Sequence, residues 1–271
     1  SKLILGIDLG GTNLAYKLVS GIEVLASAAV KTHVNFGEQL TTLYRSLQTE
    51  FGAVDVVSIG VPGPVANGIM GPSFPLNTDK NIDVGKFFSK NSEIIVRNDM
   101  QMAAYAELIN GDGKNYRNFC LVSLSTGIGV SVVVNAKVLD IRCEFGHQII
   151  MKGGQQNWNC LDHQNCWASV CSGTAIQHHG FSSKHYPFLR QINAIAFANI
   201  VCAYDPQVIF VMGGVGTNLF REIIPKKIDI ADKTNLRPVP QIKISSLSQE
   251  IGVTGAIALA NIVNTLGSEI H

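Results

Sequence analysis

The feature that most constrains the fold is a pattern of strand, glycine loop and strand that occurs twice along the chain. The apolar run Leu3–Leu9 leads into Gly10-Gly11-Thr12-Asn13, and apolar residues resume over Leu14–Val19. The second copy comprises Phe119–Leu124, Ser125–Gly129 and Val130–Val134. Each copy predicts a β-hairpin with a glycine-rich turn. Two copies in one chain predict a duplicated domain with a ligand cleft between the copies.

Helices and further strands alternate around these hairpins. We predict helices over Phe36–Phe51, around Met102 and Leu108, over Ile192–Tyr204 and over Thr254–Leu266, and buried strands over Val54–Val61, Ile94–Val96 and Val208–Val211. Such alternation is typical of the α/β class. We therefore expect a smaller N-terminal α/β lobe over residues 1–110, closed by a C-terminal helix at about 255–271, and a larger α/β lobe over residues 111–254.

The charge and length of the chain limit the classes of partner that we expect it to bind. It has 271 residues and a formal net charge of +1, with no long run of Lys or Arg, which favours neither nucleic acid nor a membrane as a partner. No apolar stretch approaches the roughly 20 residues that span a bilayer. Only five residues precede Gly6, too few for a signal peptide, so we expect a cytoplasmic protein without a disulfide framework.

The loop after Leu3–Leu9 has the composition of a phosphate-binding site. Gly10 and Gly11 leave backbone N–H groups accessible, and the side chains of Thr12 and Asn13 can donate further hydrogen bonds. Asp8, at the end of the preceding strand, is suited to orient a magnesium ion through its water shell. An ordinary glycine-rich hairpin turn is the alternative. Thr126 and Gly127 lie in the second loop, and two such loops are more specific for a triphosphate than one.

Arg97-Asn98-Asp99 lies between a predicted buried strand and a predicted helix. Phosphoryl transfer requires mainly positioning, charge neutralisation and one proton acceptor. Asp99 is suited to accept the proton of a substrate hydroxyl, and Asn98 is suited to hold a sugar hydroxyl. The alternative is that Asp99 is only the N-cap of the helix.

Several short motifs follow one another along the chain. They are Asp8–Asn13, Gly60-Val61-Pro62-Gly63-Pro64, Asn98-Asp99 with Ala103-Ala104 and Glu107, Ser125–Gly129, Glu144-Phe145-Gly146-His147, Ser172-Gly173, Asp205-Pro206 with Gly213-Gly214, and Gly255-Ala256. In this order they resemble the ROK group of sugar kinases and repressors essentially from end to end. The resemblance implies a two-lobed, actin-like ATPase fold of the ribonuclease H-like kind, with a central cleft.

The resemblance also implies an activity and a set of contacts. The implied activity is transfer of the γ-phosphoryl group of ATP, with Mg²⁺, to a hexose hydroxyl. The hydroxyl at C6 is the expected acceptor. Phosphate contacts are implied at the two glycine loops, and adenosine contacts near Gly213-Gly214 and Gly255-Ala256. The implied sugar contacts are Asn98, Asp99, Glu144 and His147, with Asn77 as a further one. The family's habit of dimerising implies a homodimer, with the sugar and ATP as small-molecule partners.

The chain departs from the family at a zinc site. Kinases of this group usually bind zinc through the histidine that is His147 here and three cysteines spaced C-x-C-x4-C. Cys160 and Cys166 remain in this chain, and the two earlier cysteine positions fall on Asn159 and Leu161. With His147 and His163, the two cysteines would form a set of two nitrogen and two sulfur donors, which zinc tolerates. The spacing is nonstandard, and two cysteines in a loop are weak support for zinc.

A second departure affects the sugar. The family places a glutamate that contacts the sugar near its anomeric end two residues after the last cysteine, and this chain has Ala168 there. Losing a buried partner of a sugar hydroxyl costs about 1–3 kcal/mol of recognition. We therefore expect broad or altered sugar specificity.

The motifs leave three candidate functions. The first is a hexose kinase, with an N-acetylmannosamine or N-acetylglucosamine kinase as its variant. The second is a non-catalytic sugar-binding regulator, but repressors of this group carry a helix-turn-helix segment for which the residues before Gly6 leave no room. The third is another actin-like ATPase, acting on a carboxylate or as a chaperone. Asp99 and the intact loop Asp8–Asn13 favour catalysis, and the stretch Glu144–His147 argues against the third function.

Overall fold

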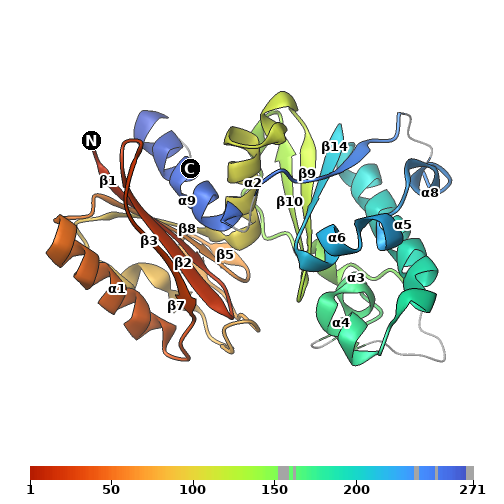
Figure 1. Ribbon diagram of the computed structural model, residues 1–271, viewed down its shortest axis with the longest axis horizontal. Helices are drawn as coiled ribbons and strands as arrows, with labels where there is room; N and C mark the ends of the chain where they lie inside the picture. The colour runs from red at the N-terminus through yellow and green to blue at the C-terminus, as the bar shows by residue number, and fades with distance from the viewer. Residues whose placement is uncertain (152–158, 161–162, 235–237, 248–249, 267–271) are drawn as a thin grey trace. The chain divides into compact units, whose positions relative to one another are not determined.

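A computed structural model describes residues 1–151, 159–160, 163–234, 238–247 and 250–266 (Figure 1). The chain forms two compact units. Unit 1 comprises Ser1–Gly111 together with Leu247–His271, and unit 2 comprises Asp112–Ser246. Each unit contains a five-stranded sheet with helices packed against it. The predicted α/β class is confirmed.

The sheet of unit 1 has the strand order β3-β2-β1-β4-β8. Its strands are β1 (Leu3–Leu9), β2 (Asn13–Ser20), β3 (Glu23–Lys31), β4 (Val56–Val61) and β8 (Glu93–Asn98). Strands β1, β2 and β3 pair antiparallel, whereas β1, β4 and β8 are parallel. The predicted first hairpin is confirmed, with β2 starting one residue earlier than expected because Asn13 already pairs with Lys31.

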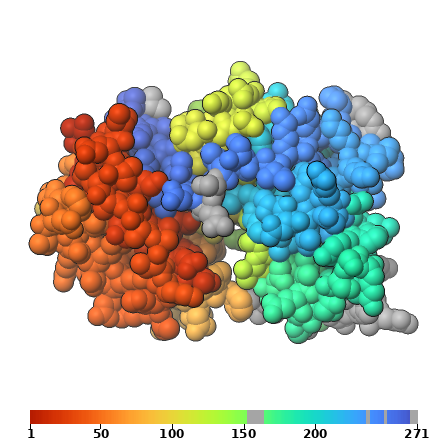
Figure 2. Space-filling model, viewed as in Figure 1, coloured from red at the N-terminus to blue at the C-terminus, as the bar shows by residue number. Residues whose placement is uncertain are grey.

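Helices cover both faces of this sheet (Figure 1). Helix α1 (Phe36–Phe51) begins at Asn35, whose side chain accepts a hydrogen bond from the Glu38 N–H, and ends at Gly52. Its buried residues Leu40, Tyr44 and Leu47 pack on one face of the sheet. Helices α2 (Asp99–Ile109) and α9 (Ile251–Leu266) pack on the other face. In the space-filling view, α1 and the β2–β3 hairpin form much of the visible surface of unit 1, which leaves β4 buried behind them (Figure 2).

Two glycines allow α9 to approach its neighbours closely. A Cβ atom on Gly6 of β1 would lie 2.7 Å from Cγ1 of Ile257. A Cβ atom on Gly255 would overlap the carbonyl oxygen of Met102 in α2. Helix α9 therefore depends on the absence of side chains at these positions to contact both the sheet and α2.

The sheet of unit 2 has the order β11-β10-β9-β14-β15. Its strands are β9 (Phe119–Leu124), β10 (Ile128–Val134), β11 (Lys137–Val138), β14 (Val208–Met212) and β15 (Gln241–Ile244). As in unit 1, the first three strands along the chain pair antiparallel, and β9, β14 and β15 are parallel. The two sheets thus share one strand order and one set of strand directions, as the duplicated hairpin pattern predicts.

The long helix of unit 2 is α5 (Tyr186–Tyr204), which begins six residues before the predicted start at Ile192. Shorter helices are α3 (Trp167–Cys171), α4 (Gly173–His178), α6 (Gly214–Asn218), α7 (Phe220–Ile223) and α8 (Lys227–Ala231). The remaining elements are the strands β5 (Val65–Ala66), β6 (Ile69–Met70), β7 (Ile82–Asp83), β12 (Asn159–Cys160) and β13 (His163–Gln164), and the 3-10 helices η1 (Val84–Phe87), η2 (Asp112–Asn115), η3 (Phe145–His147) and η4 (Ser183–His185). In the part of the chain that the structure describes, no helix combines the length and apolar character needed to cross a bilayer.

Replacing Gly255 with Ala is expected to destabilise unit 1, because the new methyl group would collide with the backbone carbonyl of Met102. We expect the free energy of unfolding to fall by about 1–3 kcal/mol, measured by urea denaturation with circular dichroism. Gly214→Ala is the matched control, since Gly214 opens helix α6 and a Cβ atom there would meet no neighbour within 4 Å. Equal stability of Gly255→Ala and the wild type would contradict this packing.

Candidate active site

The candidate residues of unit 1 lie where three parallel strands end. In the sheet, Asp8 of β1 pairs with Gly60 of β4, and Gly60 pairs with Arg97 of β8. The glycine loop, the turn Pro62–Pro64 and the pair Asn98-Asp99 continue from these strand ends. Ligands in open α/β sheets bind at the carboxyl ends of the strands. The structure therefore brings the predicted site residues of unit 1 to the edge where a ligand is expected.

The loop Ser73–Thr78 packs against the glycine loop. A Cβ atom on Gly11 would lie 2.5 Å from the carbonyl oxygen of Pro75, so this position accepts only glycine. Two backbone hydrogen bonds between Ser73 and Thr78, of 2.8 and 3.0 Å, close the loop, and Asn77 has a φ of 50°. Asn77 is thus held beside the glycine loop. The sequence did not point to Pro75, because a contact made by a backbone carbonyl does not depend on side-chain type.

Asn98 is the N-cap of α2. Its Oδ1 accepts a hydrogen bond of 2.9 Å from the Met100 N–H, and its backbone N–H donates to Oε1 of Gln101. Its Nδ2 donates to the carbonyl oxygen of Gly63 at 2.9 Å. The alternative that Asp99 is the cap is therefore wrong: Asp99 is the first residue of the helix, and its Oδ1 accepts from the Met100 N–H at 2.8 Å. Asp99 thus lies in the first turn of α2 and not at its cap.

The carboxyl group of Asp8 lies in a confined space at the start of α9. A Cβ atom on Gly252 would overlap both Oδ2 and Cγ of Asp8. Burial raises the pKa of the Asp8 carboxyl from its ordinary 3.8 to about 6. A cation next to Asp8 would favour the charged form, so the site is suited to a divalent metal ion. Gly252 was not predicted, since only the fold brings it to Asp8.

The second glycine loop is shorter than predicted. It comprises Ser125–Gly127, because β10 already starts at Ile128. The start of α4 holds this loop, since the Gly173 N–H donates to the Ser125 carbonyl at 2.6 Å and the Thr174 N–H donates to the Thr126 carbonyl at 3.2 Å. A Cβ atom on Gly127 would meet no neighbour within 4 Å, so this side of the loop is open.

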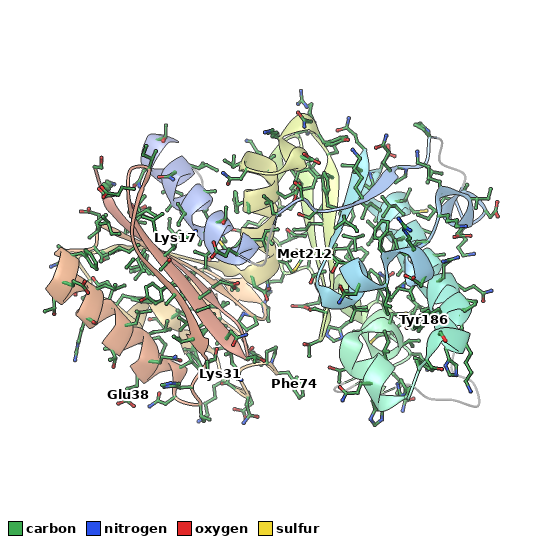
Figure 3. All side chains as sticks on the ribbon, in the orientation of Figure 1. Lys17, Lys31, Glu38, Phe74, Tyr186 and Met212 are labelled. Carbon is green, nitrogen blue, oxygen red and sulfur yellow. The ribbon has the colours of Figure 1, made fainter. Side chains whose placement is uncertain are left out.

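Gly213-Gly214 follow β14, beside the second glycine loop. Figure 3 labels Met212, the last residue of β14. Gly213 has a φ of 83°, and a Cβ atom on it would lie 2.5 Å from the carbonyl oxygen of Leu124, the last residue of β9. Gly213 therefore allows α6 to start directly against the strand that carries Ser125–Gly127. The candidate nucleotide residues of unit 2 lie together at the carboxyl ends of β9 and β14.

Glu144 directly precedes the 3-10 helix η3, and His147 is the last residue of that helix. The His147 N–H donates to the Glu144 carbonyl at 2.9 Å, and a Cβ atom on Gly146 would overlap the carbonyl oxygen of Ile128. This contact fixes the turn to the start of β10, beside the second glycine loop. Partial burial raises the pKa of the Glu144 carboxyl more than the nearby His147 lowers it. The site residues thus form two clusters, one within unit 1 and one within unit 2.

The sequence pattern of the ROK family matches residues 4–262. The chain belongs to the ROK family. It is 24% identical to N-acetyl-D-glucosamine kinase of Haemophilus influenzae (strain 86-028NP), with 94% of this chain and 98% of the relative covered.

Solved ROK structures share this fold. The ROK hexokinase from Thermus thermophilus superposes with a TM-score of 0.79 at 21% identity, covering 98% of this chain and all of that chain (100%). The ROK family glucokinase from Streptomyces griseus, in complex with glucose and AMPPNP, gives a TM-score of 0.73 at 19% identity, with 96% and 99% covered. The two-lobed actin-like ATPase fold expected for a ROK protein is confirmed.

Gly255 and Ala256, near which the ROK resemblance implies adenosine contacts, pack inside unit 1. Gly255 packs against the Met102 carbonyl, and Ala256 is fully buried between α9, α2 and the sheet. Both residues are buried within unit 1. Their glycine and alanine side chains are explained by helix packing.

The structure describes the side chains of two of the four predicted zinc donors, His147 and Cys166. Sγ of Cys166 lies 3.9 Å from Nδ1 of His147, and this thiol raises the pKa of the His147 imidazole while burial lowers it. Cys160 and His163 face each other across the β12–β13 pair, but their side chains lie outside the described part of the chain. Among the side chains that are described, no group of three or more His, Cys, Asp or Glu could hold a metal ion. The two described donors, one nitrogen and one sulfur, are of the types that zinc prefers.

Ala168 lies close to the Glu144–His147 turn. It is the second residue of α3, which packs against η3, and it is 7% exposed. The Trp167 N–H donates to the Gln148 carbonyl at 3.0 Å, which ties the start of α3 to the residue after His147. Position 168 therefore lies in the helix that packs against the turn of the predicted sugar contacts.

Asp8→Asn is expected to stabilise the protein at neutral pH. Because the folded pKa of about 6 exceeds the ordinary 3.8, the folded state binds more protons between these values, and wild-type stability falls as the pH rises through this window. The variant lacks this penalty. It should be more stable than the wild type by about 1–3 kcal/mol at pH 7.5, with a smaller difference at pH 4.5, in urea denaturation. An equal difference at both pH values would refute a buried charge at Asp8.

Proposed function

We propose that this ROK protein is an ATP-dependent sugar kinase that transfers the γ-phosphoryl group to a hexose hydroxyl. The proposed acceptor is the hydroxyl at C6. The observation that supports this best is the meeting of Asp8, the glycine loop and Asn98-Asp99 at the carboxyl ends of three adjacent parallel strands. The activities named for the Haemophilus and Thermus relatives support the same class of acceptor, and the AMPPNP in the Streptomyces complex supports ATP as the donor.

In the proposed reaction, Asp99 accepts the proton of the acceptor hydroxyl while the oxygen attacks the γ-phosphorus and ADP leaves. Its place in the first turn of α2 suits this role, because the positive end of the helix dipole favours a carboxylate there. Asn98 uses Oδ1 for the helix cap and one Nδ2 proton for Gly63, which leaves the second Nδ2 proton for a sugar hydroxyl.

The phosphates are proposed to bind at the two glycine loops. In unit 1 they contact the loop Gly10–Asn13, whose Gly10 N–H is already bound to the Asn13 carbonyl. In unit 2 they contact Thr126 and Gly127, with Gly213-Gly214 next to the nucleoside. Mg²⁺, held through Asp8, would neutralise the charge on the transferred group. His147, Cys160, His163 and Cys166 are the proposed zinc donors, with a structural role for the turn that carries Glu144.

Asp99→Asn is expected to lower kcat by about 10²- to 10⁴-fold while the affinity for sugar is largely retained, because the amide cannot take up the proton. The measurements are ADP release and sugar binding by calorimetry. Asp229→Asn is the matched control, since Asp229 also lies in the first turn of a helix and accepts a backbone N–H, at α8. Substantial turnover by the Asp99 variant would eliminate Asp99 as the base.

The identity of the sugar is tested at position 168. Ala168→Glu restores a carboxylate beside Glu144 and His147, and we expect kcat/KM for glucose to rise about 5- to 100-fold relative to N-acetylated hexosamines. The measurement is ADP release over a panel of glucose, mannose, fructose and N-acetylated hexosamines. Ala168→Gln controls for side-chain volume. A panel unchanged by the glutamate would show that position 168 does not contact the sugar.

The same panel separates the kinase from the alternative of a non-catalytic regulator. A regulator would bind a sugar in calorimetry without releasing ADP in the presence of any sugar. Sugar-dependent ADP release by the wild type supports the kinase, and sugar binding without ADP release would contradict it.

A further inference from the structure

Thr32, which directly follows β3, makes two hydrogen bonds to the first glycine loop. Its Oγ1 donates to the carbonyl oxygen of Gly10 at 2.6 Å, and its N–H donates to the carbonyl oxygen of Thr12 at 2.9 Å. The Gly10 N–H donates to the Asn13 carbonyl at 2.9 Å. Three of the loop's carbonyl groups are therefore engaged within the protein.

The amides between these carbonyls are left for a ligand. Among the residues that the structure describes, the N–H groups of Gly11 and Thr12 donate to no other residue, and both residues are exposed to solvent. A peptide plane has its carbonyl and N–H on opposite sides, so fixing the carbonyls of Gly10 and Thr12 also fixes the N–H groups of Gly11 and Asn13. Successive free N–H groups in a turn form an anion-binding concavity.

The two bonds of Thr32 differ in what they require. The N–H bond extends the pairing of β2 with β3, in which Asn13 faces Lys31, and any residue except proline could make it. The Oγ1 bond requires a hydroxyl at position 32. Lys31 and Phe74, which flank the two segments that contact the loop, both lie at the lower end of unit 1 in Figure 3.

We propose that Thr32 is a positioning residue for the nucleotide phosphates. Its hydroxyl holds the Gly10 carbonyl away from the ligand and thereby aims the Gly11 N–H at a phosphate oxygen. Pro75 supports the loop from the opposite segment through its contact with Gly11. This role rests on the proposed function, because it assumes that the loop binds a nucleotide.

The test compares Thr32→Val, which keeps the shape and removes the hydroxyl, with Thr32→Ser, which restores it. Thr41→Val is the matched control, since Oγ1 of Thr41 is also partly buried in unit 1 and donates to a backbone carbonyl, that of Phe87, at 3.1 Å. The measurements on the full chain are amide hydrogen exchange at residues 10–13, affinity for ADP, and separate KM values for ATP and the sugar. Thermal denaturation confirms that each variant is folded.

For Thr32→Val we expect exchange in the loop to be faster, and the affinity for ADP and kcat/KM for ATP to be lower, each by about 3- to 10-fold. KM for the sugar should stay close to wild type, Thr32→Ser should restore all values, and Thr41→Val should resemble the wild type. Unchanged exchange, or faster exchange with unchanged ADP affinity, would overturn the role of Thr32. A wild type that neither binds ADP nor phosphorylates a sugar would overturn the proposed function, and with it the phosphate role, even if exchange showed that Thr32 supports the loop.

Discussion

The close packing of α9 against β1 and α2 is the constraint on which the candidate site of unit 1 depends. Gly6 lacks a side chain that would separate β1 from Ile257 of α9, and Gly255 lacks one that would separate α9 from the Met102 carbonyl of α2. Gly252 places the start of α9 against the Asp8 carboxyl. The same contacts hold α2, which carries Asp99 at its first residue. The positions of both candidate acidic groups are therefore set by backbone approach.

The two candidate acidic groups of unit 1, Asp8 and Asp99, lie in different environments. Asp99 lies at a helix start whose cap is supplied by Asn98, so its position is compatible with a charged carboxylate. Asp8 lies in a confined space, and burial raises its pKa. A buried charge that costs stability in the absence of a ligand is common at functional sites, where stability and activity are in conflict. This contrast fits a proton acceptor at Asp99 and a cation site at Asp8.

Much of the fold could be predicted from local pattern. The helix over Phe36–Phe51 and the strand over Phe119–Leu124 have the predicted bounds. Apolar periodicity and Gly52 mark the helix, and a mainly apolar run between polar residues marks the strand. The cap of α2 was not resolved, since Asn98 and Asp99 are both good capping residues and only the fold selects between them. The sequence also did not indicate that Gly255-Ala256 pack a helix interface, because that contact depends on the fold. The sequence did not predict a role for Thr32 or Pro75, because their contacts with the glycine loop depend on strand register and loop closure.

The discontinuity of unit 1 has a consequence for how the chain is made. Residues 112–246 of unit 2 are continuous in the sequence, whereas unit 1 needs α9, which the ribosome adds only after all of unit 2. Until then, the apolar residues Ile4, Val56 and Ile95 lack the helix that covers them. Exposed apolar surface on a partly made chain invites aggregation and chaperone binding. During translation, residues 1–111 therefore stay incompletely folded while unit 2 can already fold.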